Sequence, residues 1–107
     1  MEQDPSQAES VTAPGVLEKY QSAGRITKAV LQEVIDKCVV GAKVVDICEF
    51  GDNRIEEETA KIYKGKKIER GIAFPTCLSV NEICGHFSPL KSDEPVVELA
   101  EGDVVKM

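Results

Sequence analysis

The segment Ile72-Ala73-Phe74-Pro75-Thr76-Cys77-Leu78-Ser79-Val80-Asn81 marks the point where the chain changes from helical to extended character. Its β-branched and aromatic residues favour a strand. Pro75 lacks an amide donor, so it belongs at an edge, a bulge or the end of that strand. We expect a second extended piece over residues 83–87, and the composition of residues 88–95 predicts a loop.

A turn and the start of another strand follow this loop. Glu101-Gly102-Asp103 predicts the turn, and Val104-Val105-Lys106-Met107 begins an alternating strand pattern. Strands typically contain about five or six residues. We therefore expect the natural chain to continue past Met107, so that the present sequence is truncated.

Two helical patterns precede the extended segment. From Val16 to Cys38, apolar side chains recur at steps of three and four residues, the spacing of one helix face. Pro14 suits the first turn of this helix, and Gly41 suits its end. A second helical pattern runs from about Val45 to Tyr63, with an apolar and a charged face.

The two predicted helices should form a hairpin. Their connection, residues 40–43, is short, which favours antiparallel packing. Gly51 lies inside the second helix, where glycine costs about 1 kcal/mol relative to alanine. It therefore indicates a close contact or a bend.

Length and composition limit the chain to one domain. Residues 1–13 are polar and predict a disordered acidic tail, which leaves residues 14–107 for the domain. The apolar runs are too short to cross a bilayer, and the N-terminus is not a secretion signal. The four cysteines are irregularly spaced, which favours reduced thiols in the cytosol or nucleus over a disulfide framework; they are Cys38, Cys48, Cys77 and Cys84.

The charge distribution is more informative than the net charge of −6, which by itself disfavours nucleic-acid binding. One basic cluster stands out within residues 61–70: Lys61, Lys64, Lys66, Lys67 and Arg70. Because the cluster falls where the second helix should end, it fits helix capping. Five cations in ten residues exceed that need, so a polyanion contact, above all RNA phosphate, is the alternative.

His86 is the single histidine, and its neighbourhood does not predict a metal site. The spacing of Cys77, Cys84 and His86 lacks the paired short intervals of structural zinc modules. On a strand, Cys84 and His86 would share a face and could form a nucleophilic pair, but no oxyanion donors accompany them. Buried or half-buried thiols are the ordinary interpretation, and a zinc or redox role remains the weaker one.

Six carboxylates lie within the second helical pattern: Asp46, Glu49, Asp52, Glu56, Glu57 and Glu58. Since the other face of that helix is apolar, a solvated helix face is favoured over an acid/base pair. The sequence also lacks a Gly-rich phosphate loop, a Ser elbow and a His-Glu-x-x-His motif.

Several blocks resemble the type 2 methionine aminopeptidase family (peptidase M24-like): Gly71–Thr76, Ser79–Asn81, Gly85–Pro89, Val45–Glu49 and Glu101–Lys106. Two longer blocks, Ile68–Thr76 and His86–Asp93, look most like the proliferation-associated, ErbB-receptor-binding branch of non-peptidase relatives. The resemblance covers about residues 16–107, in order.

This resemblance implies an α/β (α+β) architecture, the N-terminal part of a pita-bread (creatinase/aminopeptidase-like) fold with two helices followed by β-strands. It implies that His86 corresponds to a histidine beside a two-metal centre, here a vestigial candidate. The family's metal-binding carboxylates and second histidine would lie beyond Met107. Leu90 stands where the active enzymes carry a polar Asn, which suggests a pocket not tuned for peptide cleavage.

The sequence therefore predicts a non-enzymatic binding protein without cofactor or metal, with the basic cluster as nucleic-acid contact. The resemblance implies RNA or ribosome binding, ribosome biogenesis, growth regulation and transcriptional co-repression, with cytoplasmic and nuclear or nucleolar localisation. Regulatory proteins are further partners, and we expect a monomer that does not bind membranes. The alternative is a fragment of a metal-dependent methionine aminopeptidase in which His86 serves catalysis once the missing half is supplied.

Overall fold

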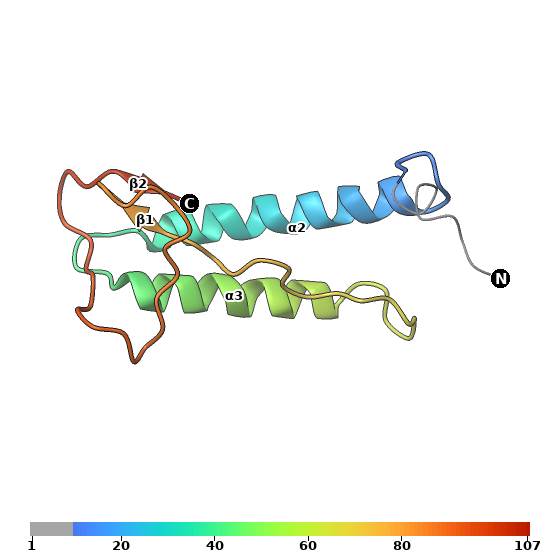
Figure 1. The fold of residues 1–107 in the computed structure, drawn as a ribbon. Coiled ribbons are helices and arrows are strands. Elements are labelled where there is room, and N and C mark those ends of the chain that lie inside the picture. The colour runs from blue at the N-terminus through green and yellow to red at the C-terminus, as the bar shows by residue number, and fades with distance from the viewer. Residues whose placement is uncertain (1–9) are drawn as a thin grey trace.

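Two antiparallel helices form the long axis of the computed structural model, which describes residues 10–107 (Figure 1). Helix α2 spans Val16–Lys37 and helix α3 spans Val44–Ala60. Both predicted helices and their antiparallel packing are confirmed. α3 ends three residues before the predicted Tyr63, whose φ of 52° lies in the left-handed region and cannot continue a helix.

The chain before α2 differs slightly from expectation. Helix α2 begins only at Val16, after Gly15 with a φ of 78°, so Pro14 precedes the first turn instead of standing in it. The N–H of Ala13 donates to the carbonyl oxygen of Ser10 at 3.0 Å, which closes a turn. Residues 1–9 of the predicted tail lie outside the described residues.

The extended part of the described chain contains one small sheet. Strand β1, Ser79–Val80, pairs antiparallel with strand β2, Val105–Lys106 (Figure 1). The predicted turn at residues 101–103 and the strand start after it are therefore confirmed, and residues 88–95 form the predicted loop.

The prediction of a strand over residues 72–81 is confirmed only for Ser79–Val80 and is wrong for residues 72–78 and for Asn81. Pro75 has no N–H, and the N–H of Thr76 donates to Oδ1 of Asp52 at 2.7 Å. The N–H of Leu78 donates to the carbonyl oxygen of Phe87 at 2.8 Å. These donors are thus unavailable to a neighbouring strand, and the segment runs along α3 instead of forming a ladder.

The predicted extended piece at residues 83–87 is also not a strand. Asn81, just before this segment, and His86, within it, have left-handed φ values of 53° and 60°, which interrupt an extended backbone. Phe87 makes two hydrogen bonds to the chain around β1. Its carbonyl accepts the N–H of Leu78, and its own N–H donates to Oγ of Ser79 at 3.3 Å. The segment is therefore held as an irregular loop over β1.

A small apolar core lies at the strand end of the hairpin. It collects one stripe of each helix and the extended segments: Val30, Val34, Val44, Ile47, Cys48, Leu78, Val80 and Leu99. Leu99 was not predicted; its N–H donates to the Ala42 carbonyl at 2.8 Å, which brings residues 97–99 over the helix connection. At the opposite end, Tyr20 is 63% exposed although it belongs to the apolar stripe of α2.

Gly51 confirms the predicted close contact. A Cβ at this position would stand 2.5 Å from Oγ1 of Thr76, closer than real Cβ atoms approach. The bare helix surface at Gly51 therefore lets the segment around Thr76 lie directly on α3. Neither helix within residues 10–107 is long and apolar enough to cross a membrane.

Candidate nucleic-acid interface

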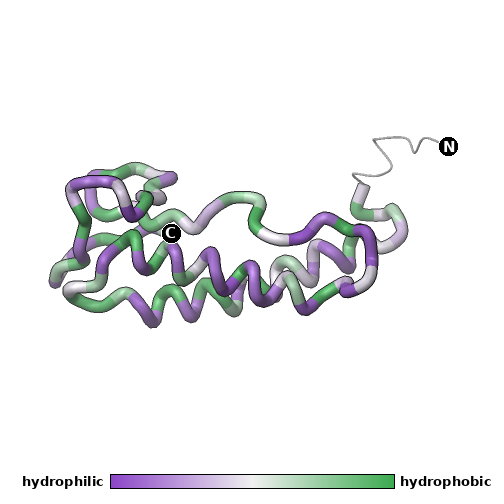
Figure 2. Tube along the Cα trace, turned by 90° about the horizontal axis from the view of Figure 1, so that it is seen from below, coloured by the Kyte–Doolittle hydropathy of each residue, from purple (hydrophilic) through white to green (hydrophobic). Residues whose placement is uncertain are grey.

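The basic cluster occupies the loop that leaves α3, at the end of the hairpin away from the sheet. All five cationic residues are exposed: Lys61, Lys64, Lys66, Lys67 and Arg70. Figure 2 shows long hydrophilic stretches at this end of the molecule. The fold thus places the cluster on the surface, clear of the core.

Only part of the cluster is used to finish the helix and its loop. Nη1 of Arg70 donates to the carbonyl oxygens of Ile62 and Tyr63 at 2.9 and 2.8 Å. Lys61 is the C-cap residue of α3, and its Nζ pairs with Oε1 of Glu58 at 3.2 Å. The capping interpretation therefore applies to Lys61 and Arg70.

Three lysines of the cluster are left over. Within residues 10–107, Lys64, Lys66 and Lys67 have no ion pair. Nζ of Lys66 lies 5.9 Å from the centre of the Tyr63 ring, within the range of a cation–π contact. These three ammonium groups are exposed and available to an anionic partner.

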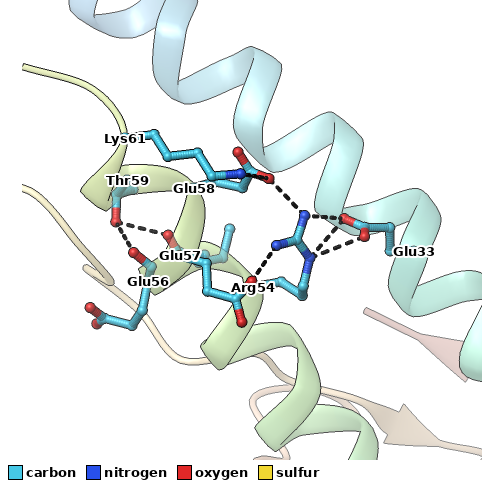
Figure 3. Close-up of polar contacts among 8 residues, drawn as sticks. Glu33, Arg54, Glu56, Glu57, Glu58, Thr59 and Lys61 are labelled. Carbon is cyan, nitrogen blue, oxygen red and sulfur yellow. Dashed lines mark hydrogen bonds and ion pairs between the residues drawn. The ribbon is translucent and has the colours of Figure 1, made fainter.

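Three carboxylates on the two helices form ion pairs with Arg54, close to the end of α3. Arg54 pairs with Glu33 at 3.0 Å, Glu57 at 2.6 Å and Glu58 at 2.7 Å, and so ties α3 to α2 (Figure 3). The pKa of Glu58 is lowered, mainly by its hydrogen bond from Arg54 and to a smaller extent by the one from Lys61. The same carboxylates raise the pKa of Arg54 further. The predicted solvated acidic face is thus partly an ion-pair network.

Two other predicted surface carboxylates also have partners. Asp52 accepts the backbone N–H of Thr76, as described above. Glu49 pairs with Lys91 at 3.0 Å, and this bond raises the pKa of Lys91. Each contact ties α3 to a later segment of the chain, so both have a structural role.

A groove lies between α2 and α3, directly beside the basic cluster. Its volume is about 510 Å³, and it is lined mainly by apolar and aromatic side chains that include Tyr20, Ile55 and Tyr63. Lys19, Glu69 and Arg70 also line it. Sequence reasoning missed this groove because it arises only where the two helices pack.

Tyr63 is unusual in two respects. Its backbone is left-handed, with a φ of 52°, and its hydroxyl oxygen is buried without a hydrogen-bond partner in the described chain. Unpaired buried hydroxyls cost about 1–3 kcal/mol. The ring is therefore held in the groove wall by packing and not by its hydroxyl.

His86 lies in a separate open hollow next to the sheet, far along the fold from the basic cluster. The hollow has a volume of about 370 Å³ and is lined by Phe74, Pro75, Cys77, Ser79, Gly85, His86, Lys106 and Met107. The exposed His86 ring packs edge-on against Phe74, with ring centres 5.2 Å apart. No carboxylate from residues 10–107 lines this hollow.

The cysteines do not form the geometry considered from the sequence. Since residues 83–87 are not a strand, the argument that Cys84 and His86 share a strand face fails. Burial raises the pKa of the Cys48 thiol to about 11, assisted by the charge of Asp52 and by Cys77. All four thiols are free. Among residues 10–107, no three His, Cys, Asp or Glu side chains gather closely enough to hold a metal ion.

The chain is similar to several known proteins, although no family model matches it. ErbB-3 binding protein 1 of Arabidopsis thaliana is 57% identical over 100 residues, 92% of this chain and 25% of that protein. Proliferation-associated protein A of Dictyostelium discoideum is 51% identical over 107 residues, 99% of this chain and 27% of that protein. Curved DNA-binding protein of Schizosaccharomyces pombe is 43% identical over 99 residues, 92% and 26% of the two chains.

The solved structure of a thermophilic Arx1 matches with a TM-score of 0.75 and 39% identity, over 86% of this chain and 25% of that one. A methionine aminopeptidase of Archaeoglobus fulgidus is 39% identical over 92 residues, 86% and 28% of the two chains. The chain has two helices followed by a small antiparallel sheet. Together with the structural match to Arx1, this element order identifies it as part of the α/β pita-bread fold of aminopeptidase-like proteins.

Within that class, the chain corresponds to one part of the ErbB-3-binding and proliferation-associated proteins, as its resemblance implied. The chain spans about a quarter of the length of the relatives it matches. Several of these relatives carry the names of binding or proliferation-associated proteins, whereas the aminopeptidases match more distantly.

Proposed function

We propose that the protein is a non-enzymatic RNA-binding member of its family that contacts RNA phosphates through Lys64, Lys66 and Lys67, with Lys61 and Arg70 beside them. The observation that carries the proposal is the set of three exposed lysines without ion pairs in the described chain. Phosphate binding needs local positive charge, which this loop supplies although the whole chain has a net charge of −6.

The comparisons support a nucleic-acid partner. A relative at 43% identity carries the name curved DNA-binding protein. The choice of RNA, ribosomal RNA included, follows the resemblance to the proliferation-associated branch. On this proposal the protein acts in ribosome biogenesis and growth regulation, in the cytoplasm and the nucleus or nucleolus.

The resemblance to the non-peptidase branch supports a role other than peptide hydrolysis. Two-metal hydrolysis requires ions held by several carboxylates, which activate a water molecule. The side chains that line the hollow at His86 are aromatic, apolar, small or cationic within the described residues. We propose that His86 is a vestige and that the surface of the protein carries its function.

A charge-reversal experiment tests the RNA contact. The triple variant Lys64→Glu, Lys66→Glu, Lys67→Glu should weaken the binding of a structured ribosomal RNA fragment by about tenfold or more at physiological salt. A matched control reverses three exposed cations elsewhere, Arg25, Lys28 and Lys43, and changes the net charge equally. Equal losses in both variants would show a general charge effect and refute the proposed contact.

A peptidase assay separates the proposal from the aminopeptidase alternative. The protein, expressed from its native gene and purified, is incubated with a Met-Ala-Ser peptide and, in turn, Zn²⁺, Mn²⁺ and Co²⁺. We expect no release of methionine above the rate of a His86→Ala variant. Release that depends on metal and is lost in His86→Ala would establish the alternative and refute the non-enzymatic assignment.

A further inference from the structure

We propose that the groove between α2 and α3 takes an unpaired base of single-stranded RNA while the adjacent basic cluster holds the phosphates on either side. This inference rests on the proposed function and makes it more specific. It predicts a preference for single strands and loops over duplex RNA.

The lining of the groove suits a planar, apolar ligand. Its volume of about 510 Å³ falls within the range of small-molecule sites. Tyr20 is 63% exposed on the groove side of α2, and Tyr63 lies in the opposite wall. Isoleucines complete the walls: Ile26, Ile55, Ile62 and Ile68. Aromatic side chains stack on bases of any sequence, because every base has a π face.

Charge links the groove to the basic cluster. Arg70 lines the groove and belongs to the cluster, and Lys19 lines it from α2. Lys66 reaches over the Tyr63 ring at 5.9 Å, so the cluster begins where the groove wall ends. Among the described residues, Glu69 is the one carboxylate that lines the groove. A nucleotide fits this arrangement, since its base is apolar on both faces and its phosphates are anionic.

The arrangement favours single strands over duplexes. In a duplex the bases are paired and stacked on one another, so none can enter a side groove without a cost in unstacking. Proteins that recognise unpaired RNA place splayed bases on aromatic rings or Arg planes. An acidic peptide would also match the charge of the cluster, but it gains less from two tyrosine rings and is the competing occupant.

Intrinsic fluorescence gives a direct readout of the groove. The sequence contains two tyrosines and no tryptophan, and both tyrosines line the groove. Binding of a single-stranded oligoadenylate of ten nucleotides should quench tyrosine emission. A duplex RNA that binds only the cluster should leave the emission unchanged. A Tyr63→Phe variant keeps the ring and isolates the signal of Tyr20.

Substitution of Tyr20 supplies the affinity test. Because Tyr20 is exposed on a helix, Tyr20→Ala should preserve the fold, as circular dichroism checks. Removal of one stacking ring should weaken oligoadenylate binding by about 5- to 100-fold, and duplex binding should stay within about twofold of wild type. Tyr20→Phe should restore the single-strand affinity, and Glu69→Gln should raise it slightly.

The outcomes distinguish this inference from the proposed function. If the lysine triple variant loses RNA while Tyr20→Ala binds both RNA forms as wild type does, the groove inference is refuted and the proposed function stands. If wild type binds neither RNA form, both fail. If poly-glutamate quenches the tyrosines and its affinity falls in Tyr20→Ala, the occupant is an acidic peptide and the inference is overturned.

Discussion

Thr76 lies directly on the backbone of α3 at Gly51, so close that a Cβ on Gly51 would stand 2.5 Å from Oγ1 of Thr76. The next residue of the helix, Asp52, accepts the backbone N–H of Thr76 at 2.7 Å. This contact fixes the segment that leads from the basic cluster to β1, and therefore connects the proposed RNA-binding end to the core.

Replacement of Gly51 tests that contact. Although alanine is the better helix former, Gly51→Ala should destabilise the protein by about 1–3 kcal/mol, because the methyl group has no space beside Thr76. The free energy of unfolding is measured by denaturant titration. Thr76→Ala in the same background removes the two closest atoms and should recover part of the stability.

Gly24 provides the matched control for this prediction. It lies in α2, and a Cβ there would meet no atom within 4 Å. Gly24→Ala should therefore stabilise the protein by about 0.5–1 kcal/mol. If Gly51→Ala proves as favourable as Gly24→Ala, the close contact at Thr76 does not exist.

The Arg54 network predicts a specific acid sensitivity. The pKa of Glu58 is lowered below its usual value of 4.5 by hydrogen bonds from Arg54 and Lys61. The resulting stability is fully present above pH 4.5 and is lost as the pH falls through the lower folded-state value. Arg54→Met should be less stable at neutral pH and should lose less stability between pH 5 and pH 3 than wild type.

Thermal unfolding across this pH range measures the effect, with Arg25→Met as control. The side chain of Arg25 reaches only the hydroxyl of Ser22 within the described residues, at 3.1 Å. Its variant should follow the wild-type pH profile. An Arg54→Met profile parallel to wild type would mean that the network does not set the acid response.

Tyr63→Phe removes a buried hydroxyl that has no partner in the described chain. Since the hydroxyl is desolvated without compensation, its removal should leave the stability unchanged or raise it by about 1–2 kcal/mol. Differential scanning calorimetry measures the change. A loss of more than about 1 kcal/mol would reveal a hydrogen bond that the structure does not contain.

The four thiols should differ widely in reactivity. Cys48 is 2% exposed and its pKa is raised to about 11, whereas Cys84 is exposed. Because the thiolate is the reactive form, iodoacetamide at pH 8 should modify Cys84 at least about 100-fold faster than Cys48. Mass spectrometry of timed samples gives both rates, and comparable rates would show that Cys48 is not buried.

The sequence predicted the helices well because their signal is local. The three- and four-residue steps from Val16 onward define α2, and a glycine inside the second helix by itself indicates a close contact at Gly51. The strand prediction over residues 72–78 failed for a non-local reason. The Thr76 donor is bound by an aspartate on α3, and no periodicity reports such a bond.

The candidate site was only partly accessible to sequence reasoning. Its five cationic residues fall within ten consecutive positions, so the sequence alone predicts the cluster. The sequence does not show which of these cations cap the helix and which are free. That depends on the Arg70 side chain, which donates to the backbone carbonyls of Ile62 and Tyr63. The groove joins Tyr20 to Tyr63 across two helices, and Leu99 reaches the core from a loop, so both required the packed structure.

The salt dependence of RNA affinity tests the central claim most directly. For single-stranded RNA, each phosphate that a lysine neutralises steepens the plot of log affinity against log salt concentration by about 0.7. The triple variant at Lys64, Lys66 and Lys67 should therefore have a slope that is shallower by about 2. Fluorescence anisotropy between 50 and 300 mM KCl supplies both slopes. Identical slopes for wild type and the triple variant would contradict the assignment of these lysines as the RNA contact.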